Sequence, residues 1–195
     1  MGVTVAYRGK MAHPERLDAF QRELLDRAAE LGARPLVIVG PPGEGEEPRE
    51  RGVVLELHPD CEAVSVLVAP DGRLRSVHEL ALSEGTLPEA DGWVSVKTQF
   101  APIEVHVRLV ALLDWLAQTW VPDLEVCDDG EFFETRDLDR LCGHREMIGH
   151  ALGTLGAALE SSAPPDDVHD DPERLADWIE GTAREVDRKH RERMH

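Results

Sequence analysis

The sequence predicts an α+β domain with a mostly antiparallel or mixed sheet of about five to seven strands, packed by three main helices. Two segments rich in β-branched residues, 52–57 and 63–69, alternate as neighbouring strands do. Apolar residues recur elsewhere at intervals of three and four, which is the spacing of amphipathic helices. The three helical segments are 14–31, 102–120 and 137–159.

The N-terminal segment predicts a strand, a helix and a second strand. Residues 3–8 alternate as a strand does, and Pro14 suits the first turn of a helix. Gly32 is a suitable C-terminal cap for that helix, and residues 36–39 are a short apolar strand. This β-α-β order allows the two strands to be parallel through a right-handed crossover.

The middle of the chain predicts an antiparallel meander. The segments 52–57 and 63–69 are followed by the turn sequence Pro70-Asp71-Gly72 and by a third strand at 73–77. A further alternating strand occupies residues 93–99.

The helix predicted at 102–120 is the most apolar element, so we expect it at the centre of the fold. A strand at 124–127, a turn at 128–130 and a short return strand at 131–134 follow it. The next helix, 137–159, contains three glycines that lower helicity or permit close packing. They are Gly149, Gly153 and Gly156.

The predicted domain spans residues 1–160. Residues 161–171 have the composition of a linker or exposed loop, and residues 172–195 form a C-terminal helical appendage. The N-terminus lacks the pattern of a secretory signal, and no apolar run is long enough to cross a bilayer. Three cysteines without a CxxC pair are typical of a reducing compartment, so we expect a soluble, cytoplasmic protein.

Charge constrains the class of partner. The net charge is -18, and residues 53–135 contain 16 acidic residues against 4 basic ones. Nucleic acids and anionic membranes attract clustered Lys and Arg, so the sequence predicts neither as a partner. A basic protein partner fits this charge, and a homo-oligomer is also possible.

A glycine-rich segment after the predicted strand 36–39 resembles the phosphate-binding loop of the P-loop NTPases. Gly40 and Gly45 have the GxxxxG spacing of that family. Glu46 and Glu47, however, stand where the family has Lys and Ser or Thr, and carboxylates repel phosphate. The segment therefore predicts a Gly/Pro loop, and no nucleotide or other cofactor is expected.

Two groups contain residues of the types that bind metals. His58 and Cys61 lie three apart at the end of a strand, and His78 could approach them across the meander, but they lack the paired spacing of zinc sites. A second group provides carboxylate oxygens for a hard divalent cation without the EF-hand pattern. Its members are Asp128, Asp129 and Glu131. The alternative for the second group is a solvated, charge-protected strand edge.

His106 has two interpretations. Its helical position turns the imidazole away from the polar face, which favours a core histidine satisfied by a backbone carbonyl. Alternatively, Lys97, Thr98 and Gln99 gather with His106 around the N-terminal amides of the helix and bind an anion, with His106 as the catalytic acid or base.

The predicted return strand suggests a protein-binding edge. One of the consecutive aromatics at 132–133 would face outward, which makes Phe133 and Glu134 candidate partner-binding residues. The leading functional hypothesis is therefore a non-catalytic cytoplasmic interaction or regulatory protein with an acidic partner-binding surface. The alternative is a small-molecule enzyme or an anion- or metal-binding domain around Lys97, Gln99 and His106.

Overall fold

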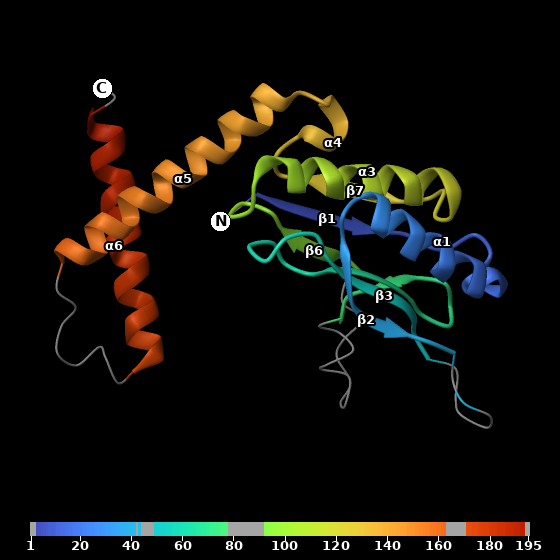
Figure 1. Cartoon of the computed structure of the whole chain (residues 1–195). Coiled ribbons are helices and arrows are strands. Elements are labelled where there is room, and N and C mark those ends of the chain that lie inside the picture. The colour runs from blue at the N-terminus through green and yellow to red at the C-terminus, as the bar shows by residue number, and fades with distance from the viewer. Residues whose placement is uncertain (1–2, 42, 44–48, 78–91, 163–170, 194–195) are drawn as a thin grey trace. The chain divides into compact units, whose positions relative to one another are not determined.

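The computed structural model describes residues 3–41, 43, 49–77, 92–162 and 171–193 (Figure 1). Its architecture is α+β, as predicted, with seven strands in two antiparallel sheets among these residues. The chain divides into two compact units, residues 1–145 and 146–195, and the division falls inside helix α5 (Leu138–Ser161). Most of the linker predicted at 161–171 lies outside the described residues.

The first unit contains a three-stranded sheet with β1 at its centre. β1 (Thr4–Arg8) pairs antiparallel with β6 (Val94–Lys97) on one side and with β7 (Glu125–Asp128) on the other. Val5 lies opposite Val96 in one ladder and opposite Asp128 in the other. This register aligns the end of β7 with the beginning of β1.

The four-stranded sheet is the predicted meander with one strand added. Its order is β2 (Arg34–Val39), β3 (Arg51–Glu56), β4 (Val64–Val68) and β5 (Leu74–Arg75), and every pair is antiparallel. The parallel pairing that the β-α-β order allowed does not occur, because β1 and β2 belong to different sheets. β2 instead pairs with β3, the next strand along the chain.

The two sheets join through backbone contacts. The Leu74 amide donates to the Gly9 carbonyl at 3.0 Å, and the Glu62 amide donates to the Lys97 carbonyl at 3.1 Å. Inside the fold, the Tyr7 hydroxyl on β1 donates to the Ser65 carbonyl on β4 at 2.6 Å. Burial raises the pKa of Tyr7, which keeps this hydroxyl neutral and able to donate.

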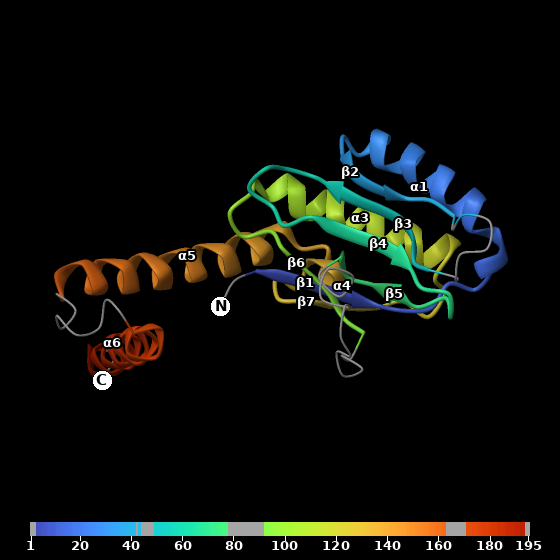
Figure 2. The same cartoon turned by 90° about the horizontal axis from the view of Figure 1, so that it is seen from below.

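Two helices cover the strands of this unit. α1 (Leu17–Glu30), preceded by the 3-10 turn η1 (Pro14–Arg16), and α3 (Ile103–Thr119) lie on the same side of the strands (Figures 1 and 2). α3 buries Val105, Leu109, Leu112, Leu113 and Leu116, which confirms its predicted place in the core. Phe20 of α1 packs edge-to-face against Trp120 just beyond α3.

The return strand predicted at 131–134 is wrong. These residues begin a one-turn helix, α4 (Phe132–Thr135), which is bounded by Glu131 and Arg136. Both bounding residues have positive φ, 55° and 59°, and Glu131 turns the chain into α4 directly after the turn that follows β7. A left-handed non-glycine residue gives an abrupt change of direction that an alternating pattern in the sequence does not reveal.

The second unit consists of the C-terminal part of α5 together with the whole of α6 (Pro172–Arg193). α6 lies where the sequence predicted the C-terminal helix. No described side chain of residues 146–195 is buried. No helix in the described part of the chain has the length and apolar character needed to cross a bilayer.

Candidate functional site

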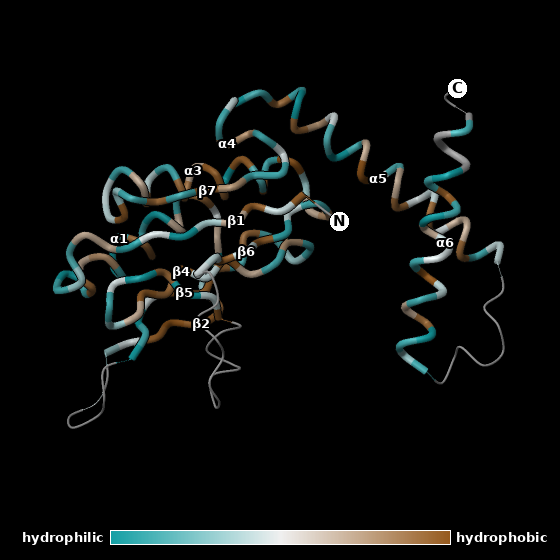
Figure 3. The backbone as a smooth tube through the Cα atoms, turned by 180° about the vertical axis from the view of Figure 1, so that it is seen from behind, coloured by the Kyte–Doolittle hydropathy of each residue, from teal (hydrophilic) through white to brown (hydrophobic). Residues whose placement is uncertain are grey.

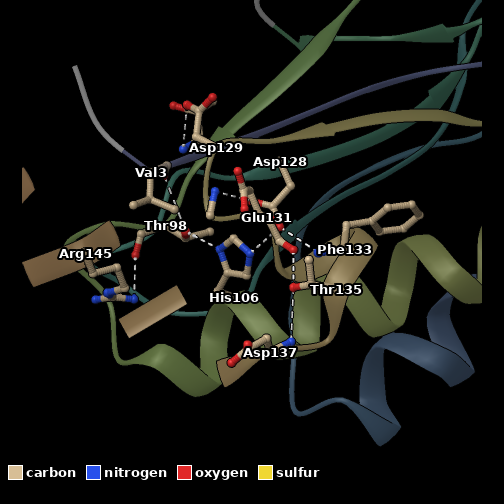
Figure 4. A network of polar contacts seen from close by, with 12 residues as sticks. Val3, Thr98, His106, Asp128, Asp129, Glu131, Phe133, Thr135, Asp137 and Arg145 are labelled. Atoms are coloured by element: carbon tan, nitrogen blue, oxygen red, sulfur yellow. Dashed lines mark hydrogen bonds and ion pairs between the residues drawn. The ribbon is translucent and has the colours of Figure 1, made fainter. Parts of the chain in front are cut away.

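The polar side chains buried in the first unit include a hydroxyl, an imidazole and a carboxylate in series (Figure 4). Thr98 follows β6, His106 lies in the first turns of α3, and Asp128 ends β7. Thr98 Oγ1 is 2.9 Å from His106 Nδ1, and His106 Nε2 is 3.0 Å from Asp128 Oδ2. We call these three residues the buried network.

The carboxylate of Asp128 accepts hydrogen bonds from three donors. The Gly130 amide donates to Oδ1 at 2.8 Å, and the Phe133 amide donates to Oδ2 at 2.8 Å, beside His106. Burial alone would raise the pKa of Asp128, but the hydrogen bond and charge of His106, with the two backbone amides, hold this pKa below its ordinary value. Asp128 is therefore a carboxylate at neutral pH.

The charge of Asp128 determines the proton on His106. A carboxylate only accepts hydrogen bonds, so His106 Nε2 is assigned the proton that it donates to Asp128. In the neutral imidazole, Nδ1 then accepts from the hydroxyl of Thr98. The Thr98 hydroxyl also lies 3.5 Å from the Val3 carbonyl. Both ring nitrogens of His106 therefore have a side-chain partner.

The surroundings of the buried network close it from solvent. Phe132 of α4 packs edge-to-face against His106, with ring centroids 6.1 Å apart. Arg145 of α5 donates to the backbone carbonyls of Gln99, at 2.9 Å, and of Ala101, which fixes the loop between β6 and α3. These contacts join two strands and three helices around one imidazole.

A series of hydroxyl, imidazole and carboxylate also occurs in hydrolases with a hydroxyl nucleophile. Such a nucleophile must reach its substrate, whereas Thr98 and His106 are both 0% exposed. The arrangement therefore acts as a cross-link of the core. The predicted core interpretation of His106 agrees with this geometry, except that side chains of Thr98 and Asp128 satisfy the ring in place of a backbone carbonyl.

The anion site predicted around His106 is not assembled. β6 alternates buried and exposed residues, so Lys97 lies on the face opposite to Thr98. The Lys97 ammonium is half exposed and lies 3.9 Å from the Glu62 carboxylate. Gln99 is half-buried, and its side-chain oxygen is enclosed without a hydrogen-bond partner among the described residues. Thr98 is the one predicted ligand-binding residue that contacts His106.

The predicted metal ligands also have other roles. Among the described residues, no three His, Cys, Asp or Glu side chains gather as a metal site. Asp128 belongs to the buried network, the Asp129 carboxylate accepts from the Thr4 amide at 3.3 Å, and Glu131 pairs with Arg140 at 2.6 Å. The three carboxylates are thus directed to different partners.

In the other predicted metal group, His58 Nδ1 accepts from the Asp60 amide at 3.1 Å. Cys61 is half-buried, and its pKa is raised to about 11 by burial and by the Glu62 charge, against the opposing charge of Arg108. A thiol with this pKa is protonated at neutral pH and is a poor metal ligand. His78 lies outside the described residues.

The acidic segment around β7 is largely occupied by contacts within the chain. Asp123 accepts from the Lys10 amide at 2.8 Å, and Glu125 pairs with Arg8 at 2.7 Å. Of the acidic side chains at positions 123–134, Glu134 alone has no hydrogen bond or ion pair with another described residue. Phe133 packs partly against the core, and the Arg136 guanidinium lies 5.0 Å from its ring centroid. The expected exposed aromatic is therefore partly covered.

No family model, curated protein or solved structure matches the chain. The surface of the chain carries the remaining evidence about its function.

That surface contains one feature that the sequence analysis did not identify as a site. β2 is an outer strand, and Leu36, Val37 and Ile38 in it are 44%, 46% and 54% exposed. The apolar run of residues 36–39 predicted a strand correctly, but a short apolar run is also typical of a buried strand. Only the order of the strands in the sheet distinguishes an exposed edge strand from a buried one.

Proposed function

We propose that this chain is a non-catalytic, cytoplasmic protein-binding module that adds an extended segment of a basic protein partner to the open edge of β2. The observation that carries the proposal is the row of three exposed aliphatic side chains on that edge. β2 hydrogen-bonds to β3 on one side, and no strand of the described part of the chain pairs with its other side (Figure 2).

An open edge offers backbone donors and acceptors to an incoming strand. Edge strands of many proteins are protected by charged side chains or by proline. β2 has Pro35 near its start, where the pairing with β3 is also irregular, and Arg34 pairs with Glu56 at 2.9 Å. Beyond this protected start, the strand is aliphatic, and it is one of the hydrophobic segments in Figure 3. Residues 36–38 are therefore the part of the edge that can accept a strand.

The backbone and the side chains of β2 both contribute to the binding of an added strand. The backbone bonds of an added strand provide affinity, and the exposed side chains provide apolar surface for alternate residues of the partner. Contiguous exposed apolar residues commonly mark an interaction site. α1 fixes β2 from within the domain, because the Gln21 side-chain amide donates to the Val39 carbonyl at 3.3 Å and to the Gly52 carbonyl at 3.2 Å.

The charge of the chain supports a basic partner. A net charge of -18 attracts cationic proteins over long range and accelerates their encounter with the surface. This attraction is screened by salt, whereas the apolar and backbone contacts at β2 are much less sensitive to salt. We therefore expect salt to slow association more than it accelerates dissociation.

The experiment uses the full chain as bait in a cell extract at low and high salt, together with Val37→Lys and the control Phe100→Lys. Phe100 is 70% exposed and lies outside both sheets, so both variants place a lysine at an exposed apolar position. We expect a partner that is retained by wild type and Phe100→Lys and lost by Val37→Lys. In the purified complex, the amides of residues 36–38 should gain protection from hydrogen exchange.

Equal capture by all three proteins, or a complex that leaves these amides unprotected, would contradict the proposal. Circular dichroism of each variant establishes that the comparison is made between folded proteins.

A further inference from the structure

An ion pair lies at each end of β2, and the two pairs expose charges of opposite sign. At the start of the strand Arg34 is paired with Glu56, and 69% of the arginine side chain is exposed against 26% of the glutamate. At the far end Asp18 is paired with Arg51, and 81% of the aspartate side chain is exposed against 15% of the arginine. Solvent therefore meets a cation at one end of β2 and an anion at the other.

The register of the sheet places the second ion pair at the Val39 end of β2. Val39 lies opposite Gly52, the residue that follows Arg51. Asp18 lies about one helical turn before Gln21, whose side-chain amide donates to the Val39 carbonyl at 3.3 Å. The Asp18 carboxylate therefore lies near the end of the strand that is opposite to Arg34.

The less exposed member of each pair belongs to β3. Arg51 and Glu56 are the first and the last residue of that strand, which lies behind β2 as seen from the open edge. The six residues of β2 extend over roughly 20 Å, since a strand rises about 3.3 Å per residue. This length exceeds the Debye length of about 8 Å at physiological ionic strength, so each exposed charge acts mainly at its own end of the edge.

We propose that these two charges orient the partner. The segment added to β2 runs antiparallel to it, with a basic residue before its aliphatic residues and no basic residue after them. This inference rests on the proposed function of β2. Every ladder between the described strands is antiparallel, and antiparallel pairing is slightly more stable per residue than parallel pairing. An antiparallel segment begins opposite Val39, near the Asp18 carboxylate, and ends opposite Arg34.

The middle of the edge cannot orient the partner by itself. Its three exposed aliphatic residues, at positions 36–38, favour apolar side chains in an incoming strand. A run of alternating aliphatic residues presents similar side chains in either direction, so the ends of the segment have to distinguish the two directions. A segment that binds in the opposite direction places its basic residue beside Arg34, where like charges repel each other.

The test uses two short peptides of identical composition and the full chain. One peptide has lysine at its N-terminal end, glutamate at its C-terminal end and alternating valine and threonine between them, and the other has the lysine and the glutamate exchanged. The net charge of -18 acts equally on both peptides, because their own net charges are the same. Binding is measured from the NMR shifts of the amides of residues 36–38 during titration. The peptide with the N-terminal lysine should have a dissociation constant at least about threefold lower, as expected of exposed ion pairs.

Charge-removing variants assign the preference to the two ends. Asp18→Asn and Arg34→Gln should each reduce the difference between the peptides, and the double variant should abolish it. Asp26→Asn is the matched control, because it removes the same charge from an exposed position of the same helix, about two turns beyond Asp18. This variant should keep the preference of the wild-type chain.

Equal affinities of the two peptides for the wild-type chain would overturn the orientation and leave the proposed binding at β2 intact. Tighter binding of the exchanged peptide would also overturn it, since that result indicates parallel addition. A preference that persists in the double variant would show that the two charges do not cause it. If neither peptide shifted the amides of residues 36–38, the proposed function of β2 would fail together with the orientation.

Discussion

β7 and β2 are both outer strands, but their side chains protect the two edges differently. At β7, the acidic residues pair with Arg8, with backbone amides and with the buried His106. At β2, three consecutive aliphatic residues face solvent. The comparison shows that a high density of acidic residues in the sequence does not by itself mark a binding surface. Around β7 these charges are paired within the chain, whereas the aliphatic side chains of β2 remain exposed.

The largest expected effect follows from breaking the buried network at β7. Asp128→Ala removes the partner of His106 and leaves two backbone amides without an acceptor. We expect the free energy of unfolding to fall by about 3–5 kcal/mol, as for other broken buried pairs. Denaturant unfolding measures it.

Asp129→Ala is the control at the next position, where the carboxylate is exposed and accepts one bond from the Thr4 amide. Its effect should stay below about 1 kcal/mol. Equal losses in the two variants would show that the burial of Asp128 is unimportant.

A smaller loss is expected at the other end of the network. Thr98→Val keeps the shape of the side chain but removes the hydroxyl that bonds to His106 Nδ1. An unsatisfied buried group costs about 1–3 kcal/mol. Thr98→Ser retains the hydroxyl and should be the more stable of the two variants in urea unfolding. The reverse order would indicate that packing of the methyl group outweighs the hydrogen bond.

Acidic pH should remove part of the stabilisation that the buried network provides. Because the pKa of Asp128 is lower in the folded chain than its ordinary value of 3.8, the folded state favours the charged form. The resulting stability is present above pH 3.8 and is lost as the pH falls through the lowered pKa.

Urea unfolding of wild type and Asp128→Asn between neutral pH and pH 3 measures this contribution. The stability difference between the two proteins should narrow toward acid, since contributions of the other carboxylates cancel. A difference that is independent of pH would contradict the lowered pKa.

Thiol reactivity gives a finer view of the exposure around β7. Cys127 is exposed on β7, whereas Cys61 is half-buried with a pKa of about 11. Because the thiolate is the reactive form, iodoacetamide at mildly alkaline pH should modify Cys127 at least about tenfold faster than Cys61. Peptide mass spectrometry over time distinguishes the two sites, with Cys61→Ser as the control for assignment. Faster modification of Cys61 would mean that the loop after β3 opens readily.

The smallest effect is expected at β2. Val37 is exposed, so Val37→Lys should change the free energy of unfolding by less than about 0.5 kcal/mol. Denaturant unfolding checks this value. A large loss of stability would mean that Val37 is covered in solution, and the free chain would then have no open edge there.

Local patterns in the sequence predicted most elements of the fold. The meander, the central helix α3 and the helices α5 and α6 follow from periodicity, because each pattern extends over several turns or an entire strand. The pairing of β1 with β6 and β7 joins segments about ninety or more residues apart in the sequence, and no local signal encodes it. Likewise, no local signal indicates the left-handed conformations of Glu131 and Arg136. These two residues bound α4, where the sequence predicted a strand.

The candidate site was predicted in part. Helical geometry placed His106 in the core, and Thr98 was named among its neighbours. Its second partner, Asp128, was predicted as a metal ligand, because acidity in the sequence does not indicate which carboxylate is buried. The apolar run of residues 36–39 predicted a strand at β2. The position of β2 at a sheet edge could not be predicted, because it depends on the pairing of strands that are separate in the sequence.

The most direct test compares the two edges in one binding experiment. Val37→Lys introduces a charge into β2, and Glu134→Lys reverses the charge of the acidic residue near β7 that has no partner among the described residues. We predict that the partner captured by the wild-type chain is lost with Val37→Lys and retained with Glu134→Lys. Retention by Val37→Lys together with loss by Glu134→Lys would place the binding surface at the acidic edge instead and contradict the role of β2.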